Sequence, residues 1–284
     1  MKHILVPTDF SKAAENALDF ALQTAKIIPS KITLLHSFEV EDNKYTDYMG
    51  VNREFNKDMI FEANVKLNEV KIHAQENFDV PIEVEVSTLN LNDAINITAK
   101  QKKVDLVVMG TLGRTGLIEK LWGSHTSSLI GKAMVPIMAI PIDFKWKQPK
   151  HMLLATKKFE RNTEILDFVF EWANLYMANV NAAVFTHNED TVEDYQQNKS
   201  EMAEYEQFLK KEYHDNSLTS THLLGLDFEA AVESYIAENN IDMLVMITYQ
   251  NGFWKNLFNP SVTKKMSYNT KIPLLAIPAN YPIK

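Results

Sequence analysis

Two kinds of segment alternate along the first half of the chain. Short and nearly continuous apolar runs are typical of strands that are buried on both faces of a sheet. Longer segments repeat apolar residues every three or four positions, as on one side of a helix. Expected strands cover residues 4–7, 31–37, 81–86, 104–109 and 135–141, and expected helices cover 11–28, 53–77, 93–100 and 124–132. This alternation predicts an α/β fold with an open, doubly wound, five-stranded parallel sheet flanked by helices.

The first expected helix has a distinctive apolar face. Ser11 is a candidate N-cap, and alanines recur every four residues behind it. A face of such small residues is suited to close packing on a sheet. The alanines are Ala13, Ala17, Ala21 and Ala25.

The same pattern starts again in the second half of the chain. Three segments recur in the same order, each at the equivalent place in the expected fold. The offset is 148 residues for the first pair (150 − 2) and 137 for the other two (241 − 104 and 272 − 135). The matching segments are 2–8 with 150–156, 104–109 with 241–246, and 135–141 with 272–278. We therefore expect two tandem domains of this fold, residues 1–147 and residues 148–284.

A cluster of glycines follows the apolar run 104–109. Of the eight glycines in the chain, four lie at positions 110, 113, 116 and 123. A hydroxyl-rich segment, 124–132, comes next and is expected to be helical. A strand, a glycine-rich turn and a helix N-terminus together form a good anion site, because free backbone N–H groups and the helix dipole converge there. Taken by itself, the stretch is equally compatible with an ordinary loop.

Composition and charge narrow the class of protein. The net charge of −8 argues against general affinity for a nucleic acid backbone. The chain has no cysteine, which excludes disulfides and cysteine metal sites and suits a reducing compartment. We find no signal-peptide pattern and no apolar run of membrane-spanning length, so we expect a cytoplasmic protein that binds neither membrane nor nucleic acid.

Familiar catalytic motifs are missing from the sequence. A P-loop would need glycine and lysine where Thr115 and Gly116 stand. No glycine-rich turn follows the first strand, which disfavours a Rossmann dinucleotide domain. There is also no His-Glu-x-x-His pattern, nucleophile elbow or pair of cysteines. We therefore assign no catalytic residue and no metal ligand.

The glycine spacing carries a family resemblance. Gly110, Gly113, Gly123 and Ser124 match a motif of Gly, two residues, Gly, nine residues, then Gly followed by Ser or Thr. With Pro-Thr-Asp ending the first strand, the chain resembles the universal stress protein family, whose fold is similar to that of the adenine nucleotide alpha hydrolases. The resemblance covers nearly the whole chain as two copies, and only the first copy keeps the motif.

The resemblance implies an ATP site, with Mg²⁺, across the carboxyl edge of the first sheet. The adenosine end would contact Asp9 with Pro7 and Thr8, and the base pocket would be lined by Ser37 and Met109. The phosphates would be held around Gly110, Leu112, Gly113, Gly123, Ser124, His125 and Thr126. The chemistry agrees, because a carboxylate accepts from ribose hydroxyls while glycine N–H groups and hydroxyls donate to phosphate. Ser37 departs from the larger apolar residue common at its position, which predicts a looser hold on the base.

Several residues near this site have a simpler interpretation beside the functional one. Asp9 could cap the first helix, and His125 could contribute only its backbone N–H. Arg114 could contact phosphate or remain solvated. Tyr45 and Tyr48 could form part of a lid or belong to an ordinary polar loop.

The second copy has lost the motif. Lys157 stands at the position of Asp9, and side chains replace three glycines. Proline at the position of Ser124 removes an N–H donor. The replacements in the glycine stretch are Ile247, Gln250, Asn259 and Pro260. We expect no ATP there, and the aromatics Tyr249, Phe253, Trp254 and Phe258 either pack the loop or form a partner surface.

Three functions remain open. The first is an ATP-binding stress-response or regulatory protein, with the second half as a scaffold. The second is a slow ATPase of the same fold, and the third is a nucleotide-free interaction protein. The last strands, 135–141 and 272–278, are expected to pair within one chain as an intrachain pseudo-dimer. Whether the tandem also forms a homodimer stays open, and the protein partner is unknown.

Overall fold

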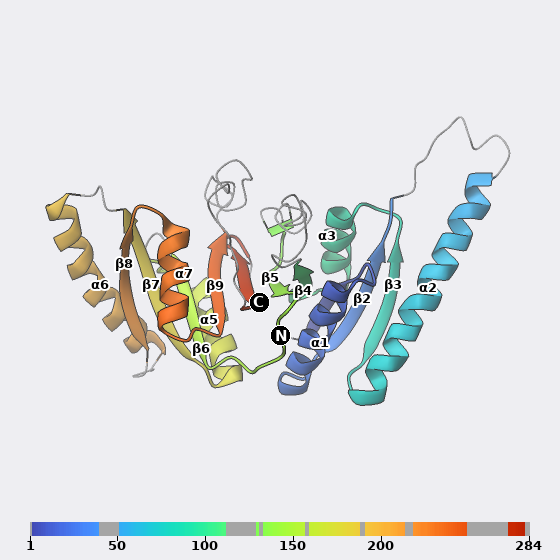
Figure 1. Cartoon of the computed structure of the whole chain (residues 1–284), viewed down its shortest axis with the longest axis horizontal. Coiled ribbons are helices and arrows are strands. Elements are labelled where there is room, and N and C mark those ends of the chain that lie inside the picture. Colours follow the sequence, from blue (N-terminus) through green and yellow to red (C-terminus); the bar gives the residue numbers. More distant parts are fainter. Residues whose placement is uncertain are drawn as a thin grey trace.

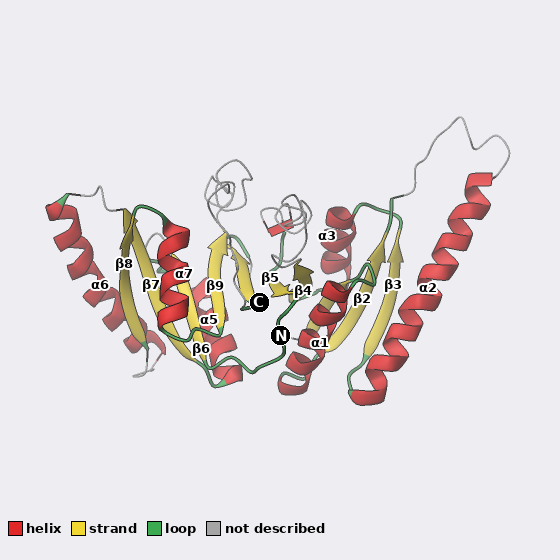
Figure 2. Ribbon diagram, in the orientation of Figure 1, coloured by secondary structure: helices red, strands yellow, loops and turns green. Residues whose placement is uncertain are grey.

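A single ten-stranded sheet runs through both halves of the chain (Figure 1). The computed structural model describes residues 2–39, 51–111, 129–130, 133–156, 159–187, 191–213, 218–248 and 272–281, and leaves out the side chains of 51–55, 187, 194–195 and 229. Helices cover both faces of the sheet, and the two termini lie near the middle of the molecule (Figure 2). The predicted α/β class is therefore confirmed.

Strands and helices follow the order that the sequence predicts, with bounds shifted by one or two residues at several ends. The elements of the first half are β1 (His3–Pro7), α1 (Lys12–Ile27), β2 (Lys31–Ser37), α2 (Val51–Asn77), β3 (Ile82–Ser87), α3 (Leu91–Lys102), β4 (Leu106–Thr111) and β5 (Ile137–Pro141). Those of the second half are β6 (His151–Thr156), α5 (Thr163–Tyr176), β7 (Asn179–His187), α6 (Val192–Tyr213), β8 (Thr219–Gly225), α7 (Phe228–Glu238), β9 (Met243–Thr248) and β10 (Leu274–Pro278). The expected helix 124–132 lies outside the described residues except for Leu129 and Ile130, which are helical.

The two halves meet at their last strands. The strand order is β3-β2-β1-β4-β5-β10-β9-β6-β7-β8, and every neighbouring pair is parallel except β5 and β10. These two run antiparallel, with Met138 opposite Leu275. The expected pairing of last strands within one chain is therefore confirmed. It also covers two edges that would otherwise expose unpaired backbone groups.

Each face of the sheet carries its own apolar core. Successive strand residues point to opposite faces, so Ile4 and Val6 join the core under α1 and α2, while Leu5 joins the core under α3. The second half repeats this division, with α5 and α6 on the first face and α7 on the second. This is why the strands read as continuous apolar runs.

Helices α1 and α5 connect the halves on the first face. The hydroxyls of Thr24 and Tyr176 lie 2.8 Å apart, and both side chains are fully buried. The ring of Trp146, from the connecting segment, packs edge-on against Phe20 of α1 and also contacts Tyr176. Burial raises the pKa of the Tyr176 hydroxyl. The two halves therefore share one core as well as one sheet.

Equivalent carboxylates make the same contacts in the two halves. Asp105 accepts the backbone N–H groups of Lys2 and His3 at 2.7 and 3.0 Å. Asp242, 137 residues later, accepts those of Lys150 and His151 at 2.9 and 3.1 Å. The sequence repeat therefore corresponds to a repeated pattern of contacts.

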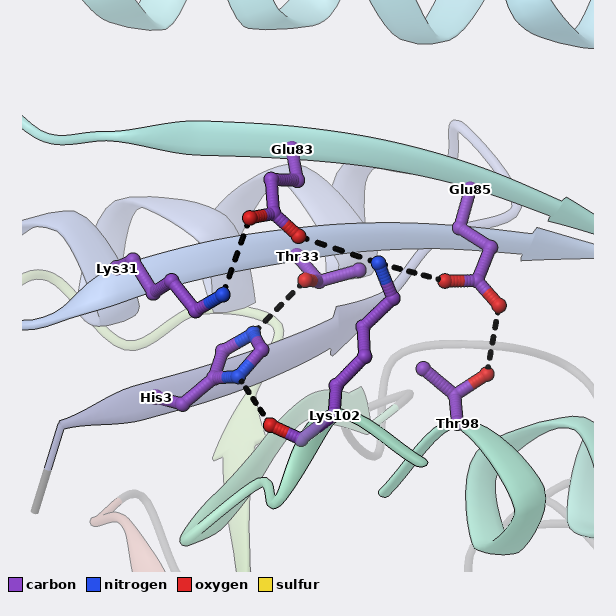
Figure 3. A network of polar contacts seen from close by, with 7 residues as sticks. All are labelled: His3, Lys31, Thr33, Glu83, Glu85, Thr98 and Lys102. Atoms are coloured by element: carbon purple, nitrogen blue, oxygen red, sulfur yellow. Dashed lines mark hydrogen bonds and ion pairs between the residues drawn. The ribbon is translucent and has the colours of Figure 1, made fainter. Parts of the chain in front are cut away.

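The amino end of the first half-sheet carries a polar network (Figure 3). Glu83 pairs with Lys31 at 3.0 Å and with Lys102 at 3.1 Å. Glu85 pairs with Lys102 at 3.1 Å and accepts the Thr98 hydroxyl at 3.0 Å. These ion pairs lower the pKa of the Glu83 carboxyl, the Lys31 contact most strongly. The two glutamates of edge strand β3 are thus paired with lysines of the same chain.

A buried histidine lies beside this network. The Nδ1 of His3 donates to the Lys102 carbonyl at 3.0 Å, and its Nε2 accepts the Thr33 hydroxyl at 2.8 Å. The ring is 2% exposed. Burial lowers its pKa, the Lys31 ammonium acts in the same direction, and the bond to the Lys102 carbonyl opposes them. His3 is therefore held neutral.

Candidate functional site

The candidate site begins where β1 ends. Thr8 continues the strand, because its N–H donates to the Leu35 carbonyl at 2.8 Å. The Thr8 carbonyl accepts from Nδ1 of His36, also at 2.8 Å, so that ring nitrogen carries the proton. The Thr8 hydroxyl accepts the N–H of Phe10 at 3.0 Å. The short loop from β1 to α1 is therefore tied to the end of β2.

Phe10 turns the chain into α1 with an unusual backbone. Its φ of 63° lies in the left-handed region, which disfavours a bulky side chain. Its ring lies 4.7 Å from that of His36, centroid to centroid, and packs on the core under α1 and α2. The packing of Phe10 therefore supports a conformation that its backbone alone would not favour.

Asp9 is exposed within this loop. One of its carboxylate oxygens accepts the backbone N–H of Ser11 at 3.0 Å. Ser11 itself is the N-cap of α1, since its hydroxyl accepts from the N–H of Ala14 at 3.3 Å. The interpretation of Asp9 as the cap of the first helix is therefore wrong, while that of Ser11 is confirmed. Asp9 orders the turn in front of the helix and presents its carboxylate to solvent.

The residues expected to line the base pocket lie on one face of the sheet. Leu5, Leu35 and Met109 all belong to the core under α3. Pro7 lies two positions after Leu5, and Ser37 lies two positions after Leu35. Both are therefore on the same face of the sheet. Pro7, Ser37 and Met109 therefore come together at the carboxyl edge, on the face that α3 covers.

The strand order reverses beside β1. From β1 the chain moves outward through β2 to β3, and then returns to the other side of β1 as β4. Open α/β sheets bind ligands outside the carboxyl ends of their strands at such a point. Asp9, after β1, and Gly110, in β4, flank this position.

Gly110 is required by packing. A Cβ at this position would lie 2.1 Å from the carbonyl oxygen of Ala13, in the first turn of α1. The alanine face of α1 brings the helix close along β4, as predicted, and Ala13, Ala17, Ala21 and Ala25 are all buried. The sequence interpretation of Gly110 considered a phosphate contact or an ordinary loop and missed this packing against α1. The small residue at Ala13 was the signal that could have found it.

Six of the predicted site residues lie outside the described part of the chain. Pro7, Thr8, Asp9, Ser37, Met109 and Gly110 are placed as above. Those outside are Leu112, Gly113, Gly123, Ser124, His125 and Thr126, and the residues with open interpretations, Tyr45, Tyr48 and Arg114, lie there too. His36 is a residue that sequence reasoning missed, although a histidine near the end of an apolar run was a signal.

The second half is built differently at the equivalent edge. Ile247 stands where Gly110 lies and is 3% exposed. Phe185 stands where Ser37 lies, is buried, and packs edge-on against Phe228 at the start of α7. Thr248 repeats the role of Thr111, as both hydroxyls donate to a carbonyl of the neighbouring strand. Lys157, Gln250, Asn259, Pro260 and the aromatics Tyr249, Phe253, Trp254 and Phe258 lie outside the described residues.

The described residues contain neither a candidate membrane-spanning helix nor a candidate metal-binding cluster. None of the helices found there is both long and apolar enough to cross a membrane. Within the same residues, no group of three or more His, Asp or Glu side chains is arranged to hold a metal ion.

Comparisons with known proteins agree with this fold. The molecule is a doubly wound α/β protein with a candidate ligand site where the strand order reverses. Residues 1–141 match the family model described as the universal stress protein family. Universal stress protein MJ0531 of Methanocaldococcus jannaschii is 30% identical over 155 residues, covering 52% of this chain and 84% of the relative. The chain belongs to the universal stress protein family.

Two further comparisons extend this result. Universal stress protein MJ0577 of the same organism is 29% identical over 155 residues, covering 49% of this chain and 94% of the relative. The crystal structure of a universal stress protein from Archaeoglobus fulgidus covers 97% of this chain and 98% of its own, with a TM-score of 0.68 and 13% identity. That similarity shows the fold over both halves.

Proposed function

We propose that this protein binds one ATP, as its Mg²⁺ complex, at the carboxyl edge of the first half, and that the second half binds none. The observation that carries the proposal is the exposed Asp9 carboxylate beside the β1–β4 reversal, on the same edge as Ser37 and Met109. We further propose residues 1–147 and 148–284 as the two domains. A reducing, cytoplasmic setting suits a chain with no cysteine.

The described residues fit the nucleoside end of such a ligand. Asp9 can accept ribose hydroxyls or the adenine amino group, because it uses one described contact and faces solvent. Ser37 and Met109 offer a hydroxyl and a flexible apolar side chain on the same face. For the phosphates, support comes from the motif Gly113, Gly123, Ser124 in the sequence. Mg²⁺ would supply charge neutralisation at the phosphates.

The second half supports the contrast. Ile247 and Phe185 place buried side chains at the equivalents of Gly110 and Ser37. Phe185 lies on the face that corresponds to the expected base pocket, so its bulk would obstruct a base held in the same manner, whereas Ile247 packs in the core under α5. We therefore infer a scaffold or regulatory role for residues 148–284, with ATP occupancy in the first half read out through conformation or assembly.

Calorimetric titration of the full chain with ATP and Mg²⁺ tests the proposal. We expect one site per chain, and at least tenfold weaker binding for Asp9→Asn and for Gly113→Val. Asp79→Asn is the matched control, because Asp79 is an exposed carboxylate at the opposite edge of the sheet. Gly110 is unsuitable as a probe, since any side chain there would strike Ala13. Two sites per chain, or unchanged affinity in Asp9→Asn and Gly113→Val, would contradict the proposal.

The same samples distinguish the remaining functions. Labelled ATP followed over hours gives little product if the protein only binds, and many turnovers per chain if it is a slow ATPase. A melting temperature that millimolar ATP leaves unchanged would favour the nucleotide-free interaction protein, because a ligand bound at a hundredfold excess over Kd stabilises by about 2.7 kcal/mol. The full chain is the right sample, since separate halves would expose β5, β10 and the shared core.

A further inference from the structure

Helix α2 exposes an apolar stripe on the outer flank of the molecule. Phe61, Val65 and Ile72 are 69%, 42% and 61% exposed. Their spacings of four and seven residues place them on one line along the helix. Figure 1 shows α2 at the far side of the first half, beyond edge strand β3. This stripe is therefore left uncovered by the part of the chain that the structure describes.

The stripe is separate from the face of α2 that packs on the sheet. Ala63, Leu67 and Ala74 are buried and belong to the inner side of the helix. The sheet therefore accounts for the inner apolar residues and leaves the outer ones unexplained.

Helix α6 provides an internal control. It occupies the same place at the other end of the sheet, beyond β8 (Figure 1). Among its described side chains, the only large apolar one that is exposed is Val192, at the first position. The middle of its outer face carries residues such as Gln196, Lys199 and Gln207. An apolar outer stripe is therefore not a requirement of this helix position.

The stripe has the spacing of a coiled-coil seam. With Val65 and Ile72 at heptad position a, Phe61 and Asn68 fall at position d. The same register places the polar residues Asp58 at position a and Gln75 at position d, so they bound the apolar part of the seam. The side-chain amide of Asn68 donates to the Asn64 carbonyl, so this polar position is partly satisfied within the helix. The three apolar layers lie within residues 61–72, which is less than two heptads, and this predicts a weak, concentration-dependent interface.

Charges beside the stripe select the direction of pairing. Lys57 and Lys71 fall at position g, and Glu62 and Glu76 fall at position e. In a parallel pair, each g residue faces the e residue five positions further along the partner helix. Lys57 would then meet Glu62, and Lys71 would meet Glu76. An antiparallel pair would place lysine against lysine and glutamate against glutamate.

Three of these four side chains are exposed, and Lys71 is half-buried. Lys57, Glu62 and Glu76 are exposed. Within the helix, His73 lies 3.2 Å from Glu76, whose side chain nevertheless remains 62% exposed. The charge pattern therefore favours a second copy of the same helix in parallel orientation.

We propose that α2 is the dimer interface of this protein, pairing in parallel with α2 of a second chain around Phe61, Val65 and Ile72. The interface lies on the outer flank and contains none of the residues assigned to nucleotide. It stands independently of the ATP proposal and is tested without nucleotide. The twofold axis would run along the paired helices and leave the β5–β10 junction inside each chain.

Sedimentation velocity over a range of protein concentrations tests the pairing. We expect the native chain to shift from monomer to dimer as concentration rises. Glu62→Lys with Glu76→Lys should stay monomeric, and so should Lys57→Glu with Lys71→Glu. Mixing these two variants should restore a dimer, because each then supplies the charge that the other lacks. All substitutions lie on the outside of a helix, and circular dichroism checks that the fold is kept.

Cysteine crosslinking tests the direction. The native chain has no cysteine, so single replacements report only on the new position. Phe61→Cys and Ile72→Cys should each form disulfide-linked dimers under mild oxidation, because both face themselves in a parallel pair. Gln207→Cys on α6 is the control and should stay monomeric. A native chain that is monomeric at every concentration, or crosslinking no better at 61 and 72 than at 207, would overturn the proposal.

Discussion

The two halves of this molecule share a fold and differ at the edge where a ligand would bind. In both, one aspartate joins the starts of the first and fourth strands, and one threonine joins the ends of the fourth and fifth strands. At the carboxyl edge, however, Gly110 and Ser37 of the first half correspond to Ile247 and Phe185 of the second. The scaffolds are therefore alike, while larger buried side chains replace glycine and serine near the carboxyl edge of the second half.

Helix packing explains how one fold accommodates both edges. The alanine face of α1 lets the helix lie close along β4, where only glycine fits at position 110. In α5 the buried face carries Phe168, Phe170, Trp172 and Tyr176, and the helix stands farther from β9. The loop that leads into the helix is also longer in the second half. The N-cap Asn162 of α5 follows Thr156 by six residues, whereas the N-cap Ser11 of α1 follows the equivalent Thr8 by three. Larger side chains thus hold the helix away and leave room for Ile247.

The amino ends of the halves differ as well. The first half uses the ion pairs of Lys31, Glu83, Glu85 and Lys102. In the second half, Tyr235 of α7 contacts Asn181 and Thr221 through its hydroxyl, and these groups are uncharged. Thr219 lies opposite Asn181 in the second half, just as Glu83 lies opposite Thr33 in the first half. Thr219 is therefore the equivalent of Glu83. Equivalent positions are therefore joined by charges in one half and by neutral hydrogen bonds in the other.

The largest expected effect tests the close approach of α1. Gly110→Ala should lower the free energy of unfolding by about 3 kcal/mol or more, because the new methyl group overlaps backbone atoms of Ala13. Gly225→Ala is the matched control. A Cβ at position 225 would meet its nearest atoms at 3.5 Å, which is an ordinary contact. Urea unfolding measures both, and equal effects would contradict the proposed reason for glycine at position 110.

The repeated aspartate should show how alike the scaffolds are. Asp105→Ala and Asp242→Ala should each cost about 1–3 kcal/mol at neutral pH, since each leaves two backbone N–H groups without their acceptor. Burial acts to raise the pKa of Asp242, but the Lys147 ion pair and the N–H donors outweigh it, and the pKa is lowered.

This lowered pKa gives the Asp242 contribution a definite pH dependence. The stabilisation is present above the unfolded-state pKa of 3.8 and is lost as the pH falls through the lower folded-state value. Urea unfolding at a series of acidic pH values should therefore show a smaller loss for Asp242→Ala as the pH falls. A loss that is the same at every pH would show that the carboxylate charge is not responsible.

His3 should make the first half sensitive to mild acid. Its pKa in the folded chain lies below the ordinary 6.5, so the unfolded chain binds the proton more readily. Stability should therefore fall as the pH drops below 6.5, and His3→Gln should reduce this dependence. His151→Gln is the matched control, because its ring is exposed at the equivalent position. Thermal unfolding at several pH values gives the comparison, and an identical slope in His3→Gln and the native chain would contradict it.

The smallest expected effect concerns the ion pairs. Lys102→Met should cost about 0.5–1 kcal/mol, because its two carboxylate contacts are partly exposed. High salt should shrink this difference by screening. Lys100→Met, on the exposed side of the same helix, is the control. A loss for Lys102→Met that does not respond to salt would point to packing of the lysine stem instead.

Much of the fold could be read from the sequence because its signals are local. The apolar runs predicted strands such as β1 and β4, and the serine at position 11 predicted the start of α1. The pairing of β5 with β10 followed from the repeat and from the need to cover two edges. Pro7, Ser37 and Met109 lie on one edge and one face of the sheet, and their role in holding a nucleotide stays a prediction.

Other features depended on contacts between distant segments. The sequence suggested phosphate as the reason for Gly110, whereas the structure adds a contact with Ala13, nearly a hundred residues earlier. Likewise, the bond from His36 to the Thr8 carbonyl and the positive φ of Phe10 depend on how β2 meets the loop after β1. Periodicity along the chain does not report such contacts.

The sequence by itself determined the order of elements, the repeat and the family motif, because hydrophobic period and glycine spacing are properties of neighbouring residues. The tertiary structure alone decided which side chains close the second edge and which apolar residues of α2 face outward. Both depend on the distance and direction at which helices approach the sheet, and that approach is set by side-chain volumes contributed from several elements at once.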